Sequence, residues 1–287
     1  MDLSHRNKQP RKAYDNLDFL ASADARILRI LSEFLEPYGR FRTEGIKDTI
    51  VFFGSARTSS REEAQKHYRR LEKKIKNVSR PPQKLLQKFE QAKVGLTMSR
   101  YYEDAVTLAR LLAEWSKTID NNRRFVICSG GGPGIMEAAN RGARLAKAKS
   151  IGLNISLPSE QDSNPFIDDR LNFQFHYFFM RKFWFVYLAK ALVFFPGGYG
   201  TLDEMMEVLT LLQTKKVKKK IAVVVYGTEY WNQVLNLNAM VSHKTIDASE
   251  LELLKFMDDP QAAFEYLKSE LSKHHRRAPE EKEALLD

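Results

Sequence analysis

A chain of 287 residues is long enough to bury the core of one large domain. Its composition is 43% hydrophobic and 29% charged with 14 Gly and 10 Pro, which excludes collagen-like, low-complexity and wholly disordered proteins. The formal net charge of +10 and the pI near 9.5 favour anionic partners such as nucleotides, nucleic acids or phosphorylated metabolites. A single cysteine, Cys128, can form neither an internal disulfide nor a multi-cysteine metal site, so we expect a cytoplasmic protein.

The two ends of the chain differ in character from its middle. Residues 1–14 are basic and lack an apolar run, so we expect a disordered tail and not a secretory signal. Residues 273–287 form a second charged tail, which leaves 15–272 as a single domain. The most apolar stretch, 173–195, contains His, Lys and Arg, so the sequence predicts no membrane span.

The N-terminal third combines helical patterns with one strand. Apolar residues recur at helical spacing over 17–35, which predicts one helix that ends at Pro37 and Gly39. The β-branched and aromatic run 49–54 predicts a buried strand. Residues 61–98 are rich in Lys and Arg, with helical patterns on both sides of a Pro-Pro pair, and we interpret them as an insertion into the domain.

Strands and helices then alternate to the end of the chain. The predicted elements are helix 102–116, strand 125–129, helix 134–148, strand 151–157, strand 171–176, helix 179–190, strand 191–195, helix 201–214, strand 221–226, and helices 231–240 and 260–272. Continuously apolar strands are typical of parallel sheets buried on both faces. The sequence therefore predicts an α/β fold with a doubly wound parallel sheet, extra helices at both ends and a helical insertion.

Three glycine-containing loops follow predicted strands, at 54–57, 129–134 and 196–201. Doubly wound sheets bind ligands beyond the carboxyl ends of their strands, and glycine loops that lead into helices suit phosphate groups. Glycine-rich turns are also common simply because tight turns require positive φ. None of the loops has the Gly-x-Gly-x-x-Gly or Gly-Lys-Ser/Thr pattern, which disfavours NAD binding and ATP hydrolysis.

Several polar residues near these loops have two interpretations. Thr201 and Glu204 fit a helix capping box, yet they also place a carboxylate beside an anion-binding loop. Arg181 and Lys182 are adjacent cations in an aromatic segment. Either they bind partners of opposite charge, or their side chains extend to solvent at a helix end. Glu137, one helical turn before Asn140, suits either sugar hydroxyls or a structural hydrogen bond.

Three motifs together carry a resemblance to a known family. They are Ser-Gly-Gly-Gly-Pro-Gly-Ile-Met-Glu-Ala-Ala-Asn-Arg-Gly at 129–142, Met-Arg-Lys at 180–182 and Pro-Gly-Gly-Tyr-Gly-Thr-Leu-Asp-Glu at 196–204. The chain resembles the LOG ("lonely guy") family, whose members are often labelled lysine decarboxylases. The likeness covers roughly residues 49–226, and the flanking segments resemble the longer class of the family. It implies a Rossmann-like fold.

The resemblance also implies a phosphoribohydrolase, which cleaves the N-glycosidic bond of a nucleoside 5′-monophosphate to free base and ribose 5-phosphate. The substrate would be AMP or an N6-modified AMP, as in cytokinin activation. Arg181 and Glu204 correspond to the family's catalytic residues. A carboxylate near the ribose can stabilise oxocarbenium character, position water or bind hydroxyls, and Arg181 would offset charge on the phosphate or the base.

The resemblance implies further contacts to the substrate. Backbone amides of the third loop would hold the 5′-phosphate, and other residues would make weaker contacts. The full set expected to bind substrate is Gly54, Ser55, Arg57, Gly131, Gly132, Glu137, Lys182, Gly197, Gly198, Gly200 and Thr201. We expect no metal and no cofactor. Family members are at least dimers with the active site near the subunit interface, so a homo-oligomer is expected.

Three other function classes are alternatives to this one. A nucleotide or molybdenum-cofactor binding protein without catalytic activity is the main alternative, although Arg181 and Glu204 favour an enzyme. A pyridoxal-dependent lysine decarboxylase has only the short Ser-His-Lys sequence at 242–244 in its favour. Nucleic-acid binding would use the basic runs 215–220 and 274–277, but such runs are more often solvated helix ends and tails.

Overall fold

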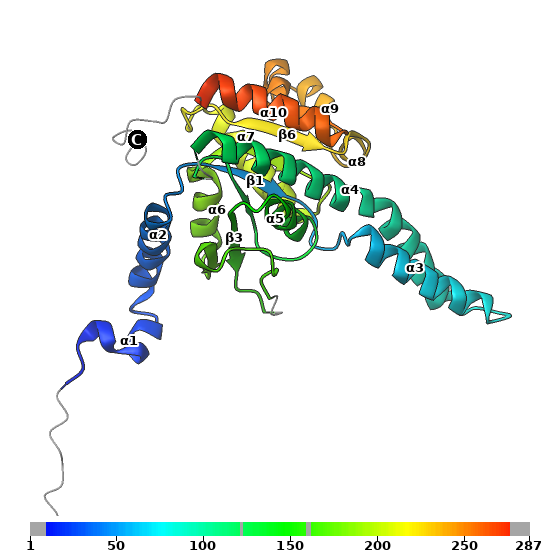
Figure 1. The fold of residues 1–287 in the computed structure, drawn as a ribbon, viewed down its shortest axis with the longest axis horizontal. Helices are drawn as coiled ribbons and strands as arrows, with labels where there is room; N and C mark the ends of the chain where they lie inside the picture. The colour runs from blue at the N-terminus through cyan, green and yellow to red at the C-terminus, as the bar shows by residue number, and fades with distance from the viewer. Residues whose placement is uncertain (1–9, 121–122, 159–161, 276–287) are drawn as a thin grey trace, which may run out of the picture.

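The centre of the molecule is a seven-stranded sheet in the order β4-β3-β2-β1-β5-β6-β7 (Figure 1). The computed structural model describes residues 10–120, 123–158 and 162–275. The strands are β1 (Thr49–Phe53), β2 (Val126–Ser129), β3 (Ser150–Ile155), β4 (Asn172–Phe175), β5 (Ala189–Phe194), β6 (Ala222–Tyr226) and β7 (Lys255–Met257). Every neighbouring pair is parallel. Because the chain winds outward from β1 in both directions, the predicted doubly wound α/β fold is confirmed.

Helices connect the strands and cover both faces of the sheet (Figure 1). The α-helices are α1 (Leu17–Ala21), α2 (Arg26–Thr43), α3 (Arg61–Lys76), α4 (Gln83–Asp120), α5 (Ile135–Leu145), α6 (Phe178–Tyr187), α7 (Tyr199–Gln213), α8 (Thr228–Val234), α9 (Leu237–Ser242) and α10 (Pro260–His275). Short 3-10 helices are η1 (Ala13–Asp15), η2 (Asp169–Leu171) and η3 (Ala248–Leu253). No helix within the described ranges is both long and apolar enough to cross a lipid bilayer.

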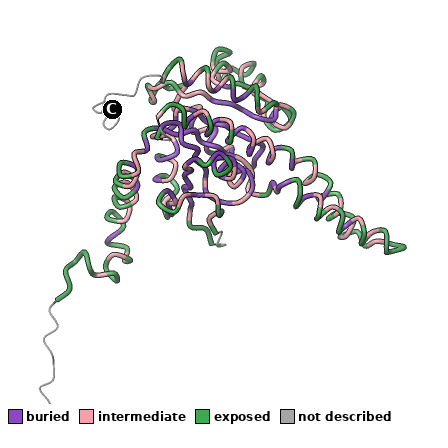
Figure 2. Tube along the Cα trace, in the orientation of Figure 1, coloured by how far each residue is buried: buried purple, intermediate pink, exposed green. Residues whose placement is uncertain are grey.

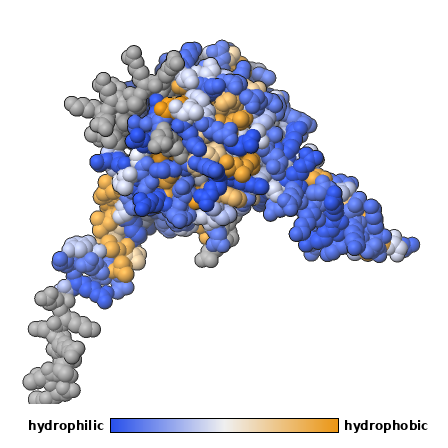
Figure 3. Space-filling view, viewed as in Figure 1, coloured by the Kyte–Doolittle hydropathy of each residue, from blue (hydrophilic) through white to orange (hydrophobic). Residues whose placement is uncertain are grey.

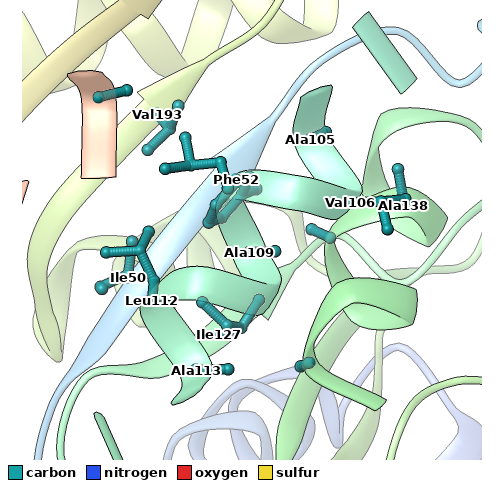
Figure 4. Packing of buried hydrophobic residues seen from close by; sticks show 14 of the residues in the cluster. Ile50, Phe52, Ala105, Val106, Ala109, Leu112, Ala113, Ile127, Ala138 and Val193 are labelled. Atoms are coloured by element: carbon teal, nitrogen blue, oxygen red, sulfur yellow. The ribbon is translucent and has the colours of Figure 1, made fainter. Parts of the chain in front are cut away.

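The core has two halves, because alternate residues of each strand point to opposite faces of the sheet. Ile50 and Phe52 belong to a cluster with residues of α4, α5 and α10. Figure 4 shows Ile50 and Phe52 beside residues of α4 such as Ala109 and Leu112. Val51 and Phe53 pack on the other face with residues of α2, α6 and α7. Burial is concentrated in the sheet and the helical segments that adjoin it, whereas α1 to α2 and the outer parts of α3 and α4 are largely exposed (Figure 2).

Helices α4 and α5 cross closely at Gly142. A Cβ atom at Gly142 would lie 2.4 Å from the Val106 carbonyl oxygen and 2.8 Å from the Ala109 Cβ. Gly142→Ala is therefore expected to lower the free energy of unfolding by about 1–3 kcal/mol, although alanine normally favours a helix. Urea denaturation would measure the change. Gly39→Ala in α2, where nothing lies within 4 Å of the added atom, is the control and should stabilise by about 0.5–1 kcal/mol.

The helix expected over 17–35 is wrong in both extent and continuity. It is divided into α1 and α2, and α2 continues through Pro37 to Thr43. A proline within a helix leaves the carbonyl four residues earlier without its usual donor. Here that carbonyl belongs to Glu33, and Trp184 Nε1 of α6 donates to it over 3.0 Å. The carboxylate of Glu33 also accepts from the backbone N–H groups of His176 and Tyr177, which joins α2 to the start of α6.

Other boundaries also differ from the predicted ones. The helix expected to start at 102 is the second half of the 38-residue α4, so the basic segment 61–98 runs directly into a helix of the core. Residues 189 and 190 begin β5 and are not helical. The helix predicted at 231–240 is divided into α8 and α9, and a seventh strand, β7, was missed. Its three residues show no distinctive pattern. Most of the expected tails lies at 1–9 and 276–287, outside the described residues, while α10 extends to 275.

Candidate active site

A cleft of about 260 Å³ lies at the carboxyl ends of the central strands. It is bounded by the loops after β1 and β2, the end of β3, and the first turns of α5, α6 and α7. The lining residues are Phe53, Gly54, Ala56, Gly130, Gly132, Met136, Asn154, Ile155, Leu157, Phe178, Arg181, Phe185, Gly200, Thr201 and Glu204. The wall is mainly apolar, with a few polar groups from different elements, which is typical of small-molecule sites.

Glu204 on α7 is the buried carboxylate of this cleft. The residue is 4% exposed, and its Oε1 lies 3.8 Å from Nη2 of Arg181. Burial raises the pKa of Glu204 from its ordinary value of 4.5 to about 7, and the positive charges of Arg181 and Lys182 only partly oppose this effect. Glu204 therefore changes charge near neutral pH, as a group that takes part in proton or charge transfer should.

Arg181 supplies the positive charge of the cleft from the first turns of α6. Its guanidinium carbon lies 5.2 Å and 5.4 Å from the ring centroids of Phe178 and Phe185. Burial lowers the pKa of Arg181, and the charge of Glu204 opposes that shift. Its Nε is buried and has no hydrogen-bond partner among the described residues. Arg181 thus retains a donor that the folded chain does not use, although buried polar groups normally have partners.

The third glycine loop forms the N-terminus of α7. This helix begins at Tyr199, and Gly198 is its N-cap without a side-chain cap. The capping-box interpretation of Thr201 and Glu204 is therefore wrong, because both lie within the helix. Within the described chain, no hydrogen bond uses the backbone N–H groups of residues 199–201. These N–H groups at a helix N-terminus suit an anion.

The second glycine loop is fixed by a buried hydrogen-bond network. The Gly131 N–H donates to Ser129 Oγ over 3.0 Å, so this amide is already used. Asn164 donates from its side chain to the carbonyls of Gly131 and Gly132. A Cβ atom at Gly131 would lie 2.3 Å from Asn154 Oδ1, and its φ of +76° also favours glycine. Gly131 is thus required by the fold of this loop.

The helix after this loop holds the other residues of the second motif. Asn140 is buried and connects three segments, because its Oδ1 accepts from Ser129 Oγ and Asn164 Nδ2 and its Nδ2 donates to the Ile151 carbonyl. Glu137 accepts a 2.6 Å hydrogen bond from the Tyr102 hydroxyl on α4. Of the two interpretations, sugar binding or structural hydrogen bonding, the second accounts for Asn140. Glu137 also has a hydrogen-bond partner within the chain.

The predicted site residues fall into two groups. Gly54, Gly132, Arg181, Gly200, Thr201 and Glu204 line the cleft, whereas Ser55, Arg57, Gly131, Glu137, Lys182, Gly197 and Gly198 do not. Lys182 Nζ instead pairs with Asp203 at 2.7 Å and with Glu207 at 2.9 Å. The carbonyl of Gly197 accepts from the Tyr230 hydroxyl, so this residue supports the loop from behind.

Sequence reasoning missed several residues of the cleft wall. Asn154 is the clearest, because a polar residue in an otherwise apolar strand is a detectable signal. Its Nδ2 donates to Asn172 Oδ1 and to the Phe173 carbonyl. Phe178 and Phe185 share a helix with Arg181, but an aromatic-rich helix is more often read as core. Within the described ranges, no group of three or more His, Cys, Asp or Glu residues could hold a metal ion.

Comparison with known proteins finds a family whose model matches part of this chain. Residues 136–267 match the model of a family described as "Possible lysine decarboxylase". The match includes Arg181, Glu204 and the whole Pro196–Glu204 motif. It confirms the resemblance to the LOG family that the three motifs predicted.

A curated enzyme also matches part of this chain. The pyrimidine/purine nucleotide 5′-monophosphate nucleosidase of Escherichia coli (strain K12) is 30% identical in an alignment of 107 residues that covers 34% of this chain. The proteins of that name from two other Escherichia coli strains match to the same extent. The aligned part is only 23% of the relative's length.

Solved structures also align with the chain. The molybdenum cofactor carrier protein of Chlamydomonas reinhardtii aligns with 79% of this chain and 99% of its own, at 17% identity and a TM-score of 0.42. A second structure of the carrier from that alga covers 60% of this chain and 90% of its own, at 22% identity and a TM-score of 0.38. Neither likeness is close enough to bear on ligand or activity.

Proposed function

We propose that the chain hydrolyses the N-glycosidic bond of a nucleoside 5′-monophosphate, giving free base and ribose 5-phosphate. The observation that carries this proposal is the buried Glu204 carboxylate, 3.8 Å from Arg181, in a cleft that also contains the N-terminus of α7. The match to a nucleotide 5′-monophosphate nucleosidase over a third of the chain supports the same reaction.

Each part of the cleft has a role in this reaction. The N–H groups at the start of α7 bind the 5′-phosphate, which places the ribose beside Glu204. As the bond between C1′ and the base nitrogen breaks, positive charge develops on the ribose ring, and the Glu204 carboxylate stabilises it. Water adds its oxygen to C1′, and its proton balances the charge of the departing base. Arg181 offsets negative charge on the phosphate or on the base.

The apolar wall provides the place for the base. Met136, Ile155 and Leu157 face the cleft together with Phe178 and Phe185. Aromatic and aliphatic side chains suit a purine, and we propose AMP or an N6-modified AMP as the substrate. An apolar N6 substituent, as in a cytokinin nucleotide, would extend this contact.

We also propose a homo-oligomer with its interface near the cleft. Phe178 and Phe179 are 50% and 55% exposed, and Tyr199, which lies between Gly198 and Gly200, is 93% exposed. Such apolar exposure beside a site is typical of surfaces that another chain covers. Light scattering of the purified protein should therefore give a mass in solution of at least two chains.

The test is a panel of nucleoside 5′-monophosphates, with the matching nucleosides as controls. We expect release of base and ribose 5-phosphate from the monophosphates, measured by chromatography, and much slower release from nucleosides that lack the phosphate. Competition between AMP and prenylated AMP then ranks the substrates. Tight binding of nucleotides without any release would contradict the proposal and would favour a nucleotide or molybdenum-cofactor carrier.

A further inference from the structure

The positive charge of the molecule is concentrated in one projecting hairpin. Residues 61–98 contain eleven Lys and Arg against four Glu, a net charge of +7 out of the chain's +10. They form α3 and the first part of α4, which extend away from the sheet as a continuous hydrophilic arm (Figures 1 and 3). From 73 to 89 the arm has six basic residues and no acidic one.

The two helices of this arm enclose a groove of about 490 Å³. Tyr68 of α3 and Phe89 of α4 pack with ring centroids 5.1 Å apart, and Leu71 and Ala92 are buried between the helices. The groove is lined by Arg57, Ser59, Ala64, His67, Arg70, Leu71, Lys74, Leu85, Lys88, Gln91, Ala92 and Gly95. Among these lining residues there is no carboxylate.

The spacing of the lining residues indicates an elongated site. On α3 they recur from Ala64 to Lys74, and on α4 from Leu85 to Gly95, so each helix contributes about three turns. At 1.5 Å per residue, ten residues span roughly 15 Å. Four cations line the groove, and the lining residues Ala64 and Ala92 are small and buried. A narrow ligand with negative charge along its length fits this arrangement.

The groove is distinct from the candidate active site, although a single loop separates them. Gly54 and Ala56 line the cleft with Glu204, whereas Arg57 and Ser59 line the groove, and no residue lines both. Arg57 was expected to contact the substrate, but it lines the groove and not the cleft. The two arginines and two lysines that line the groove suit phosphate oxygens.

We propose that the groove between α3 and α4 binds a linear, phosphate-rich anion. The ligand contacts Arg57 at the end near the sheet and Arg70, Lys74 and Lys88 along the arm. Phosphate groups in a row occur both in free polyphosphates and in the backbone of a single-stranded nucleic acid, and the groove recognises the chemistry that these share.

The test compares two triple variants with the same change in charge. Arg70→Gln, Lys74→Gln and Lys88→Gln together remove three cations from the groove. Lys66→Gln, Lys73→Gln and Lys84→Gln remove three exposed cations of the same hairpin that do not line it. Binding of inorganic tripolyphosphate and of a ten-nucleotide single-stranded RNA is measured for both variants and the full-length wild type by calorimetry, and circular dichroism checks that both variants keep their helices.

We expect the groove variant to lose affinity at least about tenfold, and the control variant less than about threefold. Loss of tripolyphosphate binding supports a free polyphosphate as the ligand. If only the RNA binds, and the groove variant again loses more affinity than the control variant, the ligand is a nucleic acid backbone. Equal losses in the two variants, or no binding of either probe at low salt, would overturn the proposal. Because binding is the readout, this result is independent of the activity proposed for the cleft.

Discussion

Replacing Glu204 by Gln is expected to lower kcat/KM for base release at least about 100-fold, because the neutral amide cannot stabilise positive charge on the ribose. The substitution keeps the size and shape of the side chain in a position that is 4% exposed. Substrate binding should change less than the rate, since in the proposed complex the N-terminus of α7 holds the phosphate. Single-turnover measurements of base release, with affinity determined separately, would show this difference.

The same role of Glu204 predicts how kcat/KM depends on pH. Burial raises the pKa of Glu204 to about 7. In the proposed reaction the ionised form is the active one. For the free enzyme, kcat/KM of the wild type should therefore rise with pH up to about 7 and level off above it. A decline over the same range would mean that Glu204 acts in its protonated form, as a general acid.

Stability measurements distinguish a direct loss of activity in Glu204→Gln from misfolding of the variant. Between its ordinary pKa of 4.5 and the folded value of about 7, Glu204 holds a proton in the folded protein that the unfolded chain has released. The free energy of unfolding of the wild type should thus fall as pH rises through this window. Glu204→Gln removes that loss and should be more stable than the wild type at pH 8 by up to about 3 kcal/mol.

A neighbouring carboxylate supplies the control. Asp203 lies on the same helix, is 56% exposed and pairs with Lys182. Asp203→Asn should retain kcat/KM within about threefold, since Lys182 keeps its contact with Glu207. If Asp203→Asn lost activity as strongly as Glu204→Gln, a general loss of negative charge on α7 would explain both.

The fold and the closeness of Arg181 to Glu204 could be predicted because both depend on local patterns. Each strand of the centre is a continuous apolar run, and strands that alternate with helices favour a parallel sheet. Arg181 and Glu204 are 23 residues apart in sequence. They meet because α6, β5 and α7 form one turn of that alternation, in which both helices begin at the same edge of the sheet.

Other features depend on partners distant in sequence, so no local pattern could reveal them. Pro37 ends a helix by its own chemistry, but Trp184 supplies the missing donor and α2 continues. The basic run 215–220 resembles a solvated helix end, yet Lys219 is half-buried and donates to the carbonyls of Val186 and Tyr187. Burial, with a smaller effect of Lys190, lowers the pKa of Lys219 to about 7.

Breaking the buried ion pair between Asp48 and Arg124 is expected to give the largest loss of stability. Asp48 Oδ2 accepts from Arg124 Nη2 at 2.9 Å and from its Nε at 3.0 Å, and the other oxygen accepts from the Phe125 N–H. The side chains are only 1% and 3% exposed. The pair joins the starts of β1 and β2, at the opposite edge of the sheet from the cleft. Asp48→Asn leaves the arginine charge buried without its counterion, which should cost about 3–5 kcal/mol.

Two comparisons test whether the ion pair itself is responsible. The double variant Asp48→Asn with Arg124→Met should lose less stability than the sum of the two single variants, because no buried charge remains unpaired. Glu114→Gln is the exposed control, since Glu114 and Arg110 lie 3.9 Å apart on the surface of α4 and contribute at most about 0.5 kcal/mol. Urea denaturation at pH 7 measures all four variants. Additive losses in the double variant would show that Asp48 stabilises the fold through its bond to the Phe125 N–H, and that the arginine contributes separately.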